Sequence, residues 1–527
     1  MTKFLMLLML LGGSLMAGAT LDAALIHTLA NGESDEKIRA IQDLGALATP
    51  EAVLVLKSLS DDALFVDGEH VFYLNGDQAI DAVTGLALTP IPESSDNVVI
   101  NNRVRSELNT ALSSLKLFDP KPSVRRKAAE ALLNDVSPDM LPVLTKAVAQ
   151  ETDAGIRELL LLAVAQINLG SPEASLRLSA VQALENSSSP NARNLLTILL
   201  DPAHEPVEAV RRAAQASLKS VDNRLALSDA LARIFSGISL GSILMLAALG
   251  LAITYGVMGV INMAHGELLM VGAYATYVTQ GWFRLHWPQA LEGYVLAAIP
   301  VAFLSAALVG VILERTVIRW LYGRPLETLL ATWGLSLGLI QCARLMFGAQ
   351  NVELTNPSWM SGRVALPWGL SLPWNRIDII LFSLFVLALV WVLMNKTRLG
   401  LFVRAVTQNR AMAGCMGVPT GLIDTVAFGL GAGIAGLGGV ALSQISNVGP
   451  DMGQGYIVDS FMVVVLGGVG QLAGAVWAAL GLGILSKFLE GWVGAVIAKI
   501  ILLVFVIIFI QRRPQGLFAL KGRFVDN

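Results

Sequence analysis

The chain has 527 residues, of which 54% are hydrophobic and only 15% are charged, whereas ordinary soluble proteins have about a quarter charged residues. A soluble protein of this composition could not cover its surface with polar groups, so we expect much of the chain to face lipid. The composition therefore excludes a disordered protein, a nucleic-acid-binding protein and a wholly soluble enzyme.

The net charge of −3 conceals two halves of opposite sign. Residues 1–230 contain 19 Lys and Arg against 29 Asp and Glu, whereas residues 231–527 contain 18 against 11. We therefore expect an acidic soluble part joined to a basic membrane part.

The first 19 residues have the pattern of a secretory signal peptide. Lys3 precedes a short apolar run over residues 4–11, and small residues follow at 17–19. The run is too short for a helix to cross a bilayer, so cleavage is favoured over an uncleaved anchor, which is the alternative. In either case we expect residues 20–230 to be exported to the periplasm.

Residues 20–230 predict a helical-repeat domain. Arg125, Arg157, Arg177 and Arg211 each stand near the start of a segment in which Ala and Leu recur at helical spacing. Two of the intervals between these arginines are 32 and 34 residues, near the size of a helix-pair repeat, although the middle interval is 20. The pattern resembles irregular HEAT-like repeats, whose stacked helix pairs bury faces that no single pair could bury alone.

One insertion interrupts these repeats. In residues 64–73, Asp67-Gly68 stands between two short apolar runs, which predicts a small β-hairpin with its turn at this dipeptide. For the whole exported domain, binding a partner and serving as a spacer or stabilising module are equally consistent with the sequence.

Residues 231–527 predict a polytopic helical membrane domain, so the expected fold class is all-α. A helix needs about 20 apolar residues to cross a bilayer, so we expect seven to nine spans. The uncharged stretches are 234–266, 268–283, 293–313, 328–343, 379–395, 425–450 and 460–486, followed by an apolar run over 500–511.

The basic loops predict the orientation in the membrane. Residues 314–327, residues 396–410 and the tail after residue 511 together hold 11 of the 18 cations, so we expect them in the cytoplasm. With the first domain outside and the C-terminus inside, the number of spans should be odd.

Small residues at four-residue spacing indicate closely packed helices. Residues 428–439 read FGLGAGIAGLGG and place small side chains on one helix face. Such faces allow helix backbones to approach closely in lipid.

The sequence lacks a nucleotide-binding loop of its own. The dipeptide Gly-Lys, which the phosphate-binding loop requires, does not occur. Cys342 and Cys415 are too few and too far apart for a zinc site or a disulfide framework. No motif in the sequence therefore indicates an enzyme, and we expect no cofactor or metal.

Two polar clusters interrupt the apolar stretches. Asn262, His265 and Glu267 are expected to form a short cytoplasmic turn, with Glu267 capping the next helix, and a role for His265 in a solute pathway is the alternative. Residues 397–420 are too polar to span and predict a short amphipathic helix along the inner face. It could dock another protein or simply connect two spans.

Four motifs resemble the branched-chain amino acid permease family of ABC transporters. They lie in order between residue 236 and about residue 523: YGVMGVINMAHGE at 255–267, LYGRPLETLLATWGL at 321–335, VLGGVG at 465–470 and RPQGLF at 513–518. Within that family, an exported helical-repeat domain ahead of the permease resembles the urea-transporting branch.

The resemblance implies an inner-membrane importer in which this chain forms a urea pathway with a second, homologous permease. Two cytoplasmic ATPases and a periplasmic substrate-binding protein would complete it, and ATP would be used by those partners. Candidate pathway residues are Asn262, His265, Thr332, Ser336 and Ser460. The stretch 398–417 occupies the family's ATPase-coupling position, with candidate contacts at Gly400, Arg404, Ala405, Asn409, Arg410 and Gly417.

Other interpretations stay open. The solute could be a branched-chain amino acid or a short amide, and an ATP-independent urea channel or secondary transporter would also lack a phosphate loop. An exported interaction protein that uses its membrane part mainly as an anchor is a further alternative.

Overall fold

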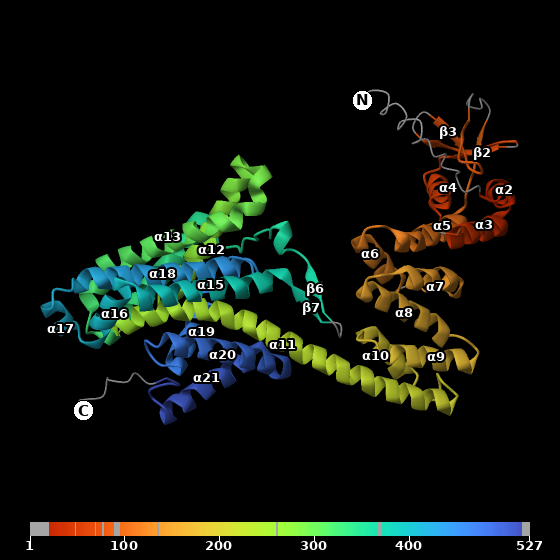
Figure 1. Ribbon diagram of the computed structural model, residues 1–527. Helices are drawn as coiled ribbons and strands as arrows, with labels where there is room; N and C mark the ends of the chain where they lie inside the picture. Colours follow the sequence, from red (N-terminus) through yellow and green to blue (C-terminus); the bar gives the residue numbers. More distant parts are fainter. Residues whose placement is uncertain are drawn as a thin grey trace, which may run out of the picture. The chain divides into compact units, whose positions relative to one another are not determined.

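The computed structural model describes residues 21–518, except 48, 69, 76–77, 89–94, 134–135, 260–261 and 367–369 (Figure 1). The expected signal peptide lies outside the described residues. Contacts divide the chain into two compact units, Met1–Ala226 and Leu227–Asn527.

The first unit is built mainly of short helices with polar N-caps. Asp153, for example, accepts the backbone N–H groups of Gly155 and Ile156 and so starts a helix with two of its free donors satisfied. The helices are α2 (Ala23–Asn31), α3 (Ser34–Leu47), α4 (Pro50–Ser60), α5 (Asn102–Leu115), α6 (Pro122–Leu132), α7 (Leu141–Gln150), α8 (Ala154–Leu169), α9 (Ala174–Leu184), α10 (Pro190–Ile198) and the first part of α11 (Glu208–Met258), with 3-10 turns η1 (Lys116–Phe118) and η2 (Pro138–Met140).

A small antiparallel sheet is inserted between α4 and α5. Its order is β4-β3-β2-β1-β5, and Leu64 pairs with Tyr73 and Asp67 with His70 across the first two strands. These two strands form the hairpin that the sequence predicts, but the sheet is larger than that hairpin. The strands are β1 (Leu64–Asp67), β2 (His70–Asn75), β3 (Gln78–Asp81), β4 (Ala87–Leu88) and β5 (Asp96–Asn97).

Buried arginine contacts recur along the helices of this unit. Arg125 of α6 donates to Glu151 at 2.8 Å and to the Asp119 carbonyl oxygen at 2.9 Å. Arg177 of α9 makes the same contacts with Glu205, at 2.7 Å, and with the carbonyl oxygen six residues before itself. Each arginine thereby ties its own helix to the segment that precedes α8 or α11.

The short interval between Arg157 and Arg177 also has a structural reason. A single helix of 16 residues, α8, fills it, and α9 follows directly, so this part of the stack lacks the second helix of a pair.

The second unit is a bundle of long apolar helices (Figure 1). Its helices are the rest of α11, α12 (His265–His286), α13 (Tyr294–Thr316), α14 (Pro325–Phe347), α15 (Trp374–Lys396), α16 (Arg398–Gln408), α17 (Arg410–Cys415), α18 (Thr420–Ser443), α19 (Met452–Gly467), α20 (Leu472–Val493) and α21 (Ala495–Arg512). The shorter elements are η3 (Pro288–Gly293), η4 (Ile318–Leu321), η5 (Ser358–Met360) and the antiparallel pair β6 (Arg363–Ala365) and β7 (Ser371–Pro373).

Among the described residues, seven helices are long and apolar enough to cross a membrane, in agreement with the lower end of the expected range. They are α11, α13 with η3, α14, α15, α18, α20 and α21. α19 is apolar but has only 16 residues, and α12 has 22 residues but is not among the seven.

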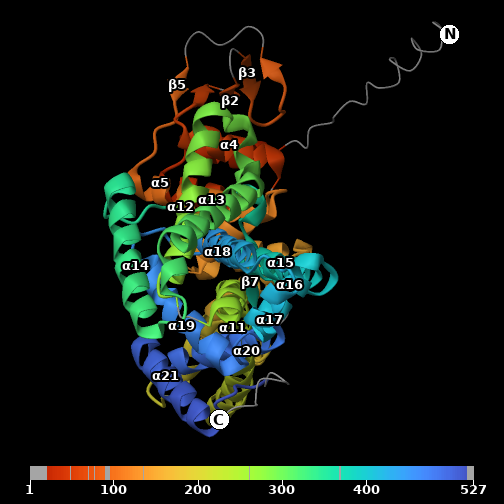
Figure 2. The same ribbon diagram turned by 90° about the vertical axis from the view of Figure 1, so that its left-hand side faces the viewer.

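α18 lies at the centre of the bundle and packs against both α12 and α13, which also pack against each other (Figure 2). Gly436 packs against Ala302 and Ala306 of α13, whereas Gly439 lies against Leu269 of α12, and neither position has room for a Cβ atom. The close packing expected from the small residues at 428–439 is confirmed.

Candidate functional site

The chain turns back into the bundle after α11. The His265 side chain lies with Nε2 3.1 Å from the carbonyl oxygen of Ala247, which stands eleven residues before the end of α11. That offset corresponds to about 16 Å along a helix, so α12 begins beside a point about three turns before the end of α11.

The expected cytoplasmic turn at residues 262–267 is therefore wrong. Asn262, His265 and Glu267 are only 3%, 0% and 1% exposed. Glu267 does not cap α12, because its carboxylate accepts a hydrogen bond from Ser336 of α14. The position of these residues at the junction of two uncharged stretches predicts a boundary between two spans. The close packing of the Gly266 backbone against that of Gly453 instead places them inside the protein.

Two hydroxyl groups of α14 hold the start of α12. Thr332 accepts the backbone N–H of Met263 at 3.1 Å, and Ser336, one turn further, donates to Glu267 at 3.0 Å. Four of the five expected pathway residues thus lie around one helix start: Asn262, His265, Thr332 and Ser336.

The start of α19 meets the start of α12. A Cβ atom built on Gly453 would lie 2.7 Å from Glu267 Oε2 and 2.5 Å from the carbonyl oxygen of Gly266. Helix N-termini present unpaired N–H groups and a partial positive charge, so two such ends converge near one carboxylate. The fifth expected residue, Ser460, lies two turns further along α19 and is fully buried.

Several buried polar atoms at this site have no hydrogen-bond partner within the described part of the chain. They are Asn262 Nδ2, His265 Nδ1, Glu267 Oε2 and Ser460 Oγ. A cavity of about 170 Å³ adjoins Asn262 and is otherwise lined by side chains of α11, α14 and α19 and by Met263. Apart from Asn262, the residues that line this cavity are apolar, and His265, Glu267 and Ser460 do not line it. Buried polar groups normally have a protein, water or ligand partner, so each unpaired atom is a candidate contact for water or a solute.

Ser336 also stands in the pattern Gly-Leu-Ser-Leu-Gly at 334–338, which has the spacing of a hydrolase nucleophile turn. That turn joins a strand to a helix, whereas Ser336 lies in the interior of α14. Here the pattern belongs to a membrane helix and does not indicate a nucleophile.

The second candidate segment consists of two helices rather than the one expected. Asn409 separates α16 from α17 and caps α17 by accepting the N–H of Met412 at 2.9 Å. Gly417 ends the segment with φ +84°, a conformation that favours glycine, and Gly400 packs against the backbone of Met394. Gly400, Asn409 and Gly417 therefore shape the segment.

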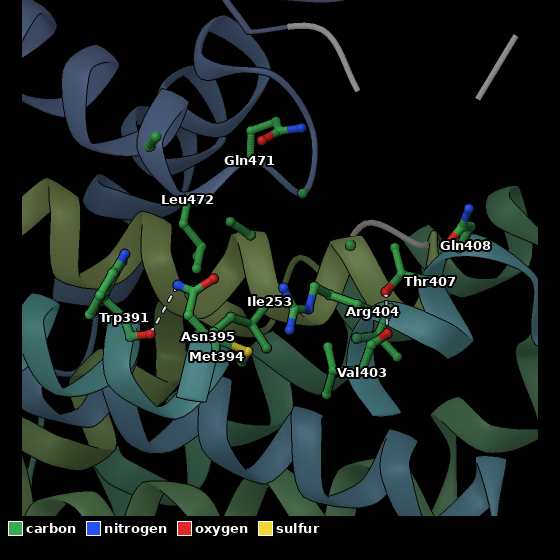
Figure 3. A pocket seen from close by; sticks show the side chains of 15 residues that line it. Ile253, Trp391, Met394, Asn395, Val403, Arg404, Thr407, Gln408, Gln471 and Leu472 are labelled. Atoms are coloured by element: carbon green, nitrogen blue, oxygen red, sulfur yellow. Dashed lines mark hydrogen bonds between the residues drawn. The ribbon is translucent and has the colours of Figure 1, made fainter. Parts of the chain in front are cut away.

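On α16, Arg404 is exposed and Ala405 is half-buried. Ala405 packs against the main core of the bundle, and Arg404 lines a cavity of about 510 Å³ between α16, the ends of α11 and α15 and the turn before α20. Figure 3 shows the Arg404 side chain extending across this cavity toward Asn395. Its Nε donates to the Gly400 carbonyl oxygen at 3.3 Å.

Arg410 is engaged within the chain itself. It donates to the carboxylate of Asp424, which is 0% exposed, and its guanidinium lies 5.1 Å from the ring centroid of Tyr322. These contacts fasten α17 to α18 and η4.

Comparison with known proteins places these features in a family. Residues 233–511, more than half of the chain, match the profile described as "Branched-chain amino acid transport system / permease component". The chain belongs to this permease family. It is therefore a multi-pass membrane permease of the branched-chain amino acid type of ABC transporter, like the transport permeases that it resembles.

Curated relatives match the second unit of this permease. The high-affinity branched-chain amino acid transport system permease protein LivH of Escherichia coli K12 is 26% identical over 55% of this chain and 95% of its own length. BraD of Pseudomonas aeruginosa, described in the same words, gives the same three values. The ribose import permease protein RbsC of Escherichia coli K12 is 31% identical, but over only 19% of this chain and 33% of its own length. No solved structure matches the chain.

Proposed function

We propose that this permease forms one half of a urea pathway in an ATP-driven importer, with a second permease as the other half. The observation that carries the proposal is the group of buried, unpaired polar atoms on Asn262, His265 and Ser460. Urea is small and neutral and has several donors and acceptors, so a pathway for it needs hydrogen-bonding groups more than charges.

Two cytoplasmic ATPases would supply the energy, since the chain contains no Gly-Lys dipeptide for a phosphate-binding loop. They would dock on α16 and α17, and a periplasmic binding protein would deliver urea. ATP would shift the permease pair between its outward-open and inward-open states by binding these states with different affinity.

The first unit would be an exported HEAT-like repeat domain in the periplasm. Its recurring Arg–Glu contacts, from Arg125 to Glu151 and from Arg177 to Glu205, support a repeated packing of helices. An acidic helical stack of this kind would offer an extended surface to the binding protein.

A branched-chain amino acid is the second candidate solute. LivH and BraD are branched-chain amino acid transport permeases, and the two helix N-termini that meet at Gly266 and Gly453 could accept a carboxylate.

Uptake by the reconstituted complex distinguishes these solutes. We expect proteoliposomes supplied with ATP and binding protein to accumulate radiolabelled urea, and excess unlabelled leucine not to compete. Leucine uptake, or full competition by leucine, would replace urea with an amino acid as the solute.

A further inference from the structure

An ion pair joins two otherwise uncharged helices of the bundle. Lys499 is the only charged residue of α21 before its last position, Arg512, and Asp459 is the only one of α19. Their side chains meet at 3.2 Å, and the Lys499 ammonium also lies 3.4 Å from the carbonyl oxygen of Gly455. Charged groups within membrane helices are costly and usually face a protein partner or water.

The chain itself does not enclose this pair. The Lys499 side chain is 56% exposed, whereas the Asp459 side chain is 18% exposed. Lys499 turns toward α19 instead of away from the bundle, so its charge is held against a helix whose exposed surface is polar.

Two further polar side chains lie on this face of α19: Gln454 and, at its N-cap, Asp451. Asp451, which pairs with Arg344 at 2.8 Å, is followed at helical spacing by Gln454 and Gly455 and then by Val458 and Asp459. Residues three to four apart lie on one helix face, so these positions form a strip. Asp451, Gln454, Gly455 and Val458 are all exposed.

This strip borders the candidate pathway. Val458 lines the 170 Å³ cavity beside Asn262, which lies between α19 and α14. Figure 2 shows α14, α19 and α21 along one side of the bundle, and α15 on the other. The exposed surface of α15 is apolar, with Leu381, Leu384, Phe385 and Leu389 all more than half exposed, as expected of a face that meets lipid.

We propose that this strip of α19, which carries Asp451, Gln454 and Asp459 and is flanked by Arg344 and Lys499, lines a water-filled solute pathway that the second permease closes from the opposite side. This assignment rests on the proposed two-permease transporter. It identifies the partner-facing side of the chain and predicts that a small hydrogen-bonding solute passes along α19 toward Asn262.

Cysteine accessibility in the full reconstituted complex tests the assignment. In a background with Cys342→Ser and Cys415→Ala, the test variants are Gln454→Cys and Val458→Cys. Leu384→Cys and Leu389→Cys on α15 are the controls, because their side chains are similarly exposed and apolar. A charged, membrane-impermeant thiosulfonate reagent is the probe, and co-purification of all subunits verifies assembly.

We expect both α19 cysteines to react several-fold faster than both α15 cysteines. Equal labelling rates on α19 and α15 would overturn the assignment. Labelling of Gln454→Cys without labelling of Val458→Cys would also overturn it, because water would then reach only the start of α19 and not the cavity beside Asn262. Labelling requires neither urea nor ATP. If the α19 cysteines react rapidly but the complex does not take up urea, only the proposed solute is rejected. If the complex takes up urea but the α19 cysteines do not react, only the assignment of the α19 face is rejected.

Discussion

Arg410 of α17 is paired with Asp424, a carboxylate completely buried near the start of the central helix α18. The guanidinium also lies over Tyr322, whose hydroxyl donates to Glu314 of α13 at 3.0 Å. Glu314 in turn accepts from Thr425 of α18 at 2.7 Å. Polar contacts thus join the proposed docking segment to α18 and α13, so we expect a displacement of α17 to act directly on α18.

Removing Arg410 should destabilise the bundle, because the buried Asp424 carboxylate would lose its counter-charge. Breaking a fully buried pair costs about 3–5 kcal/mol, and we expect a smaller loss here because the Arg410 side chain is 42% exposed. We expect Arg410→Ala to lower the thermal stability of the purified protein, and the double variant with Asp424→Asn to recover part of the loss. Wild-type stability of Arg410→Ala, or a further loss in the double variant, would show that the pair does not hold α17 in place.

Reversing the charge at Arg404 should weaken docking of the ATPases without unfolding the spans. Arg404 lies on α16 at the 510 Å³ cavity, so a carboxylate there would alter the surface offered to the partner. Co-purification of ATPase subunits with Arg404→Glu measures this effect. Arg512→Glu is the matched control, since Arg512 is an exposed cation at the end of α21. Equal recovery of ATPases with both variants would count against docking at α16.

Adding one methyl group at Gly439 should separate α18 from α12, because a Cβ atom there meets the Leu269 carbonyl oxygen. We expect Gly439→Ala to lower the melting temperature in detergent and the yield of folded protein. Gly338→Ala on α14 is the control: its Cβ would meet nothing within 4 Å, and replacing a helical glycine gains about 0.5–1 kcal/mol. Similar melting temperatures for the two variants would contradict the tight α12–α18 contact.

The first unit should lose stability in acid. Hydrogen bonds from Arg125 and Arg177 hold the pKa of Glu151 and that of Glu205 below the ordinary glutamate range. A carboxyl group with a lowered pKa in the folded state contributes stability above its unfolded pKa of about 4.3, and this contribution is lost as the pH falls through the folded value.

Because three separate buried cores lie within residues 21–225, we expect a fragment of residues 21–226 to fold alone and to report this effect. In urea titrations followed by circular dichroism, Glu205→Gln should be less stable than the wild type at pH 7. The difference should shrink as the pH is lowered below 4. A difference that stays constant with pH would mean that the Arg177–Glu205 pair does not contribute through its charge.

Patterns of charge and hydrophobicity predicted the apolar spans and the packing of residues 428–439, because lipid imposes these patterns directly. The hairpin was also predicted, since Asp67-Gly68 determines its turn locally. The other three strands were missed because β3 has only four residues and β4 and β5 only two each, too few for a clear periodicity.

The position of His265 could not be predicted from the same rules. A polar cluster between apolar stretches is typical of a loop at the membrane surface, and only the close approach of Gly266 and Gly453 shows that two helices begin inside the bundle. The Asp459–Lys499 pair was missed for a similar reason: both residues border predicted apolar runs, but their contact joins helices 40 residues apart.

The central claim is that this permease moves solute only when partner subunits hydrolyse ATP. The direct measurement is radiolabelled urea uptake by proteoliposomes that contain the complete complex, with either active ATPases or ATPases disabled in hydrolysis. The account predicts ATP-dependent accumulation with active subunits and, with disabled ones, uptake no faster than into protein-free liposomes. Equal uptake by both preparations would contradict it and identify an ATP-independent channel.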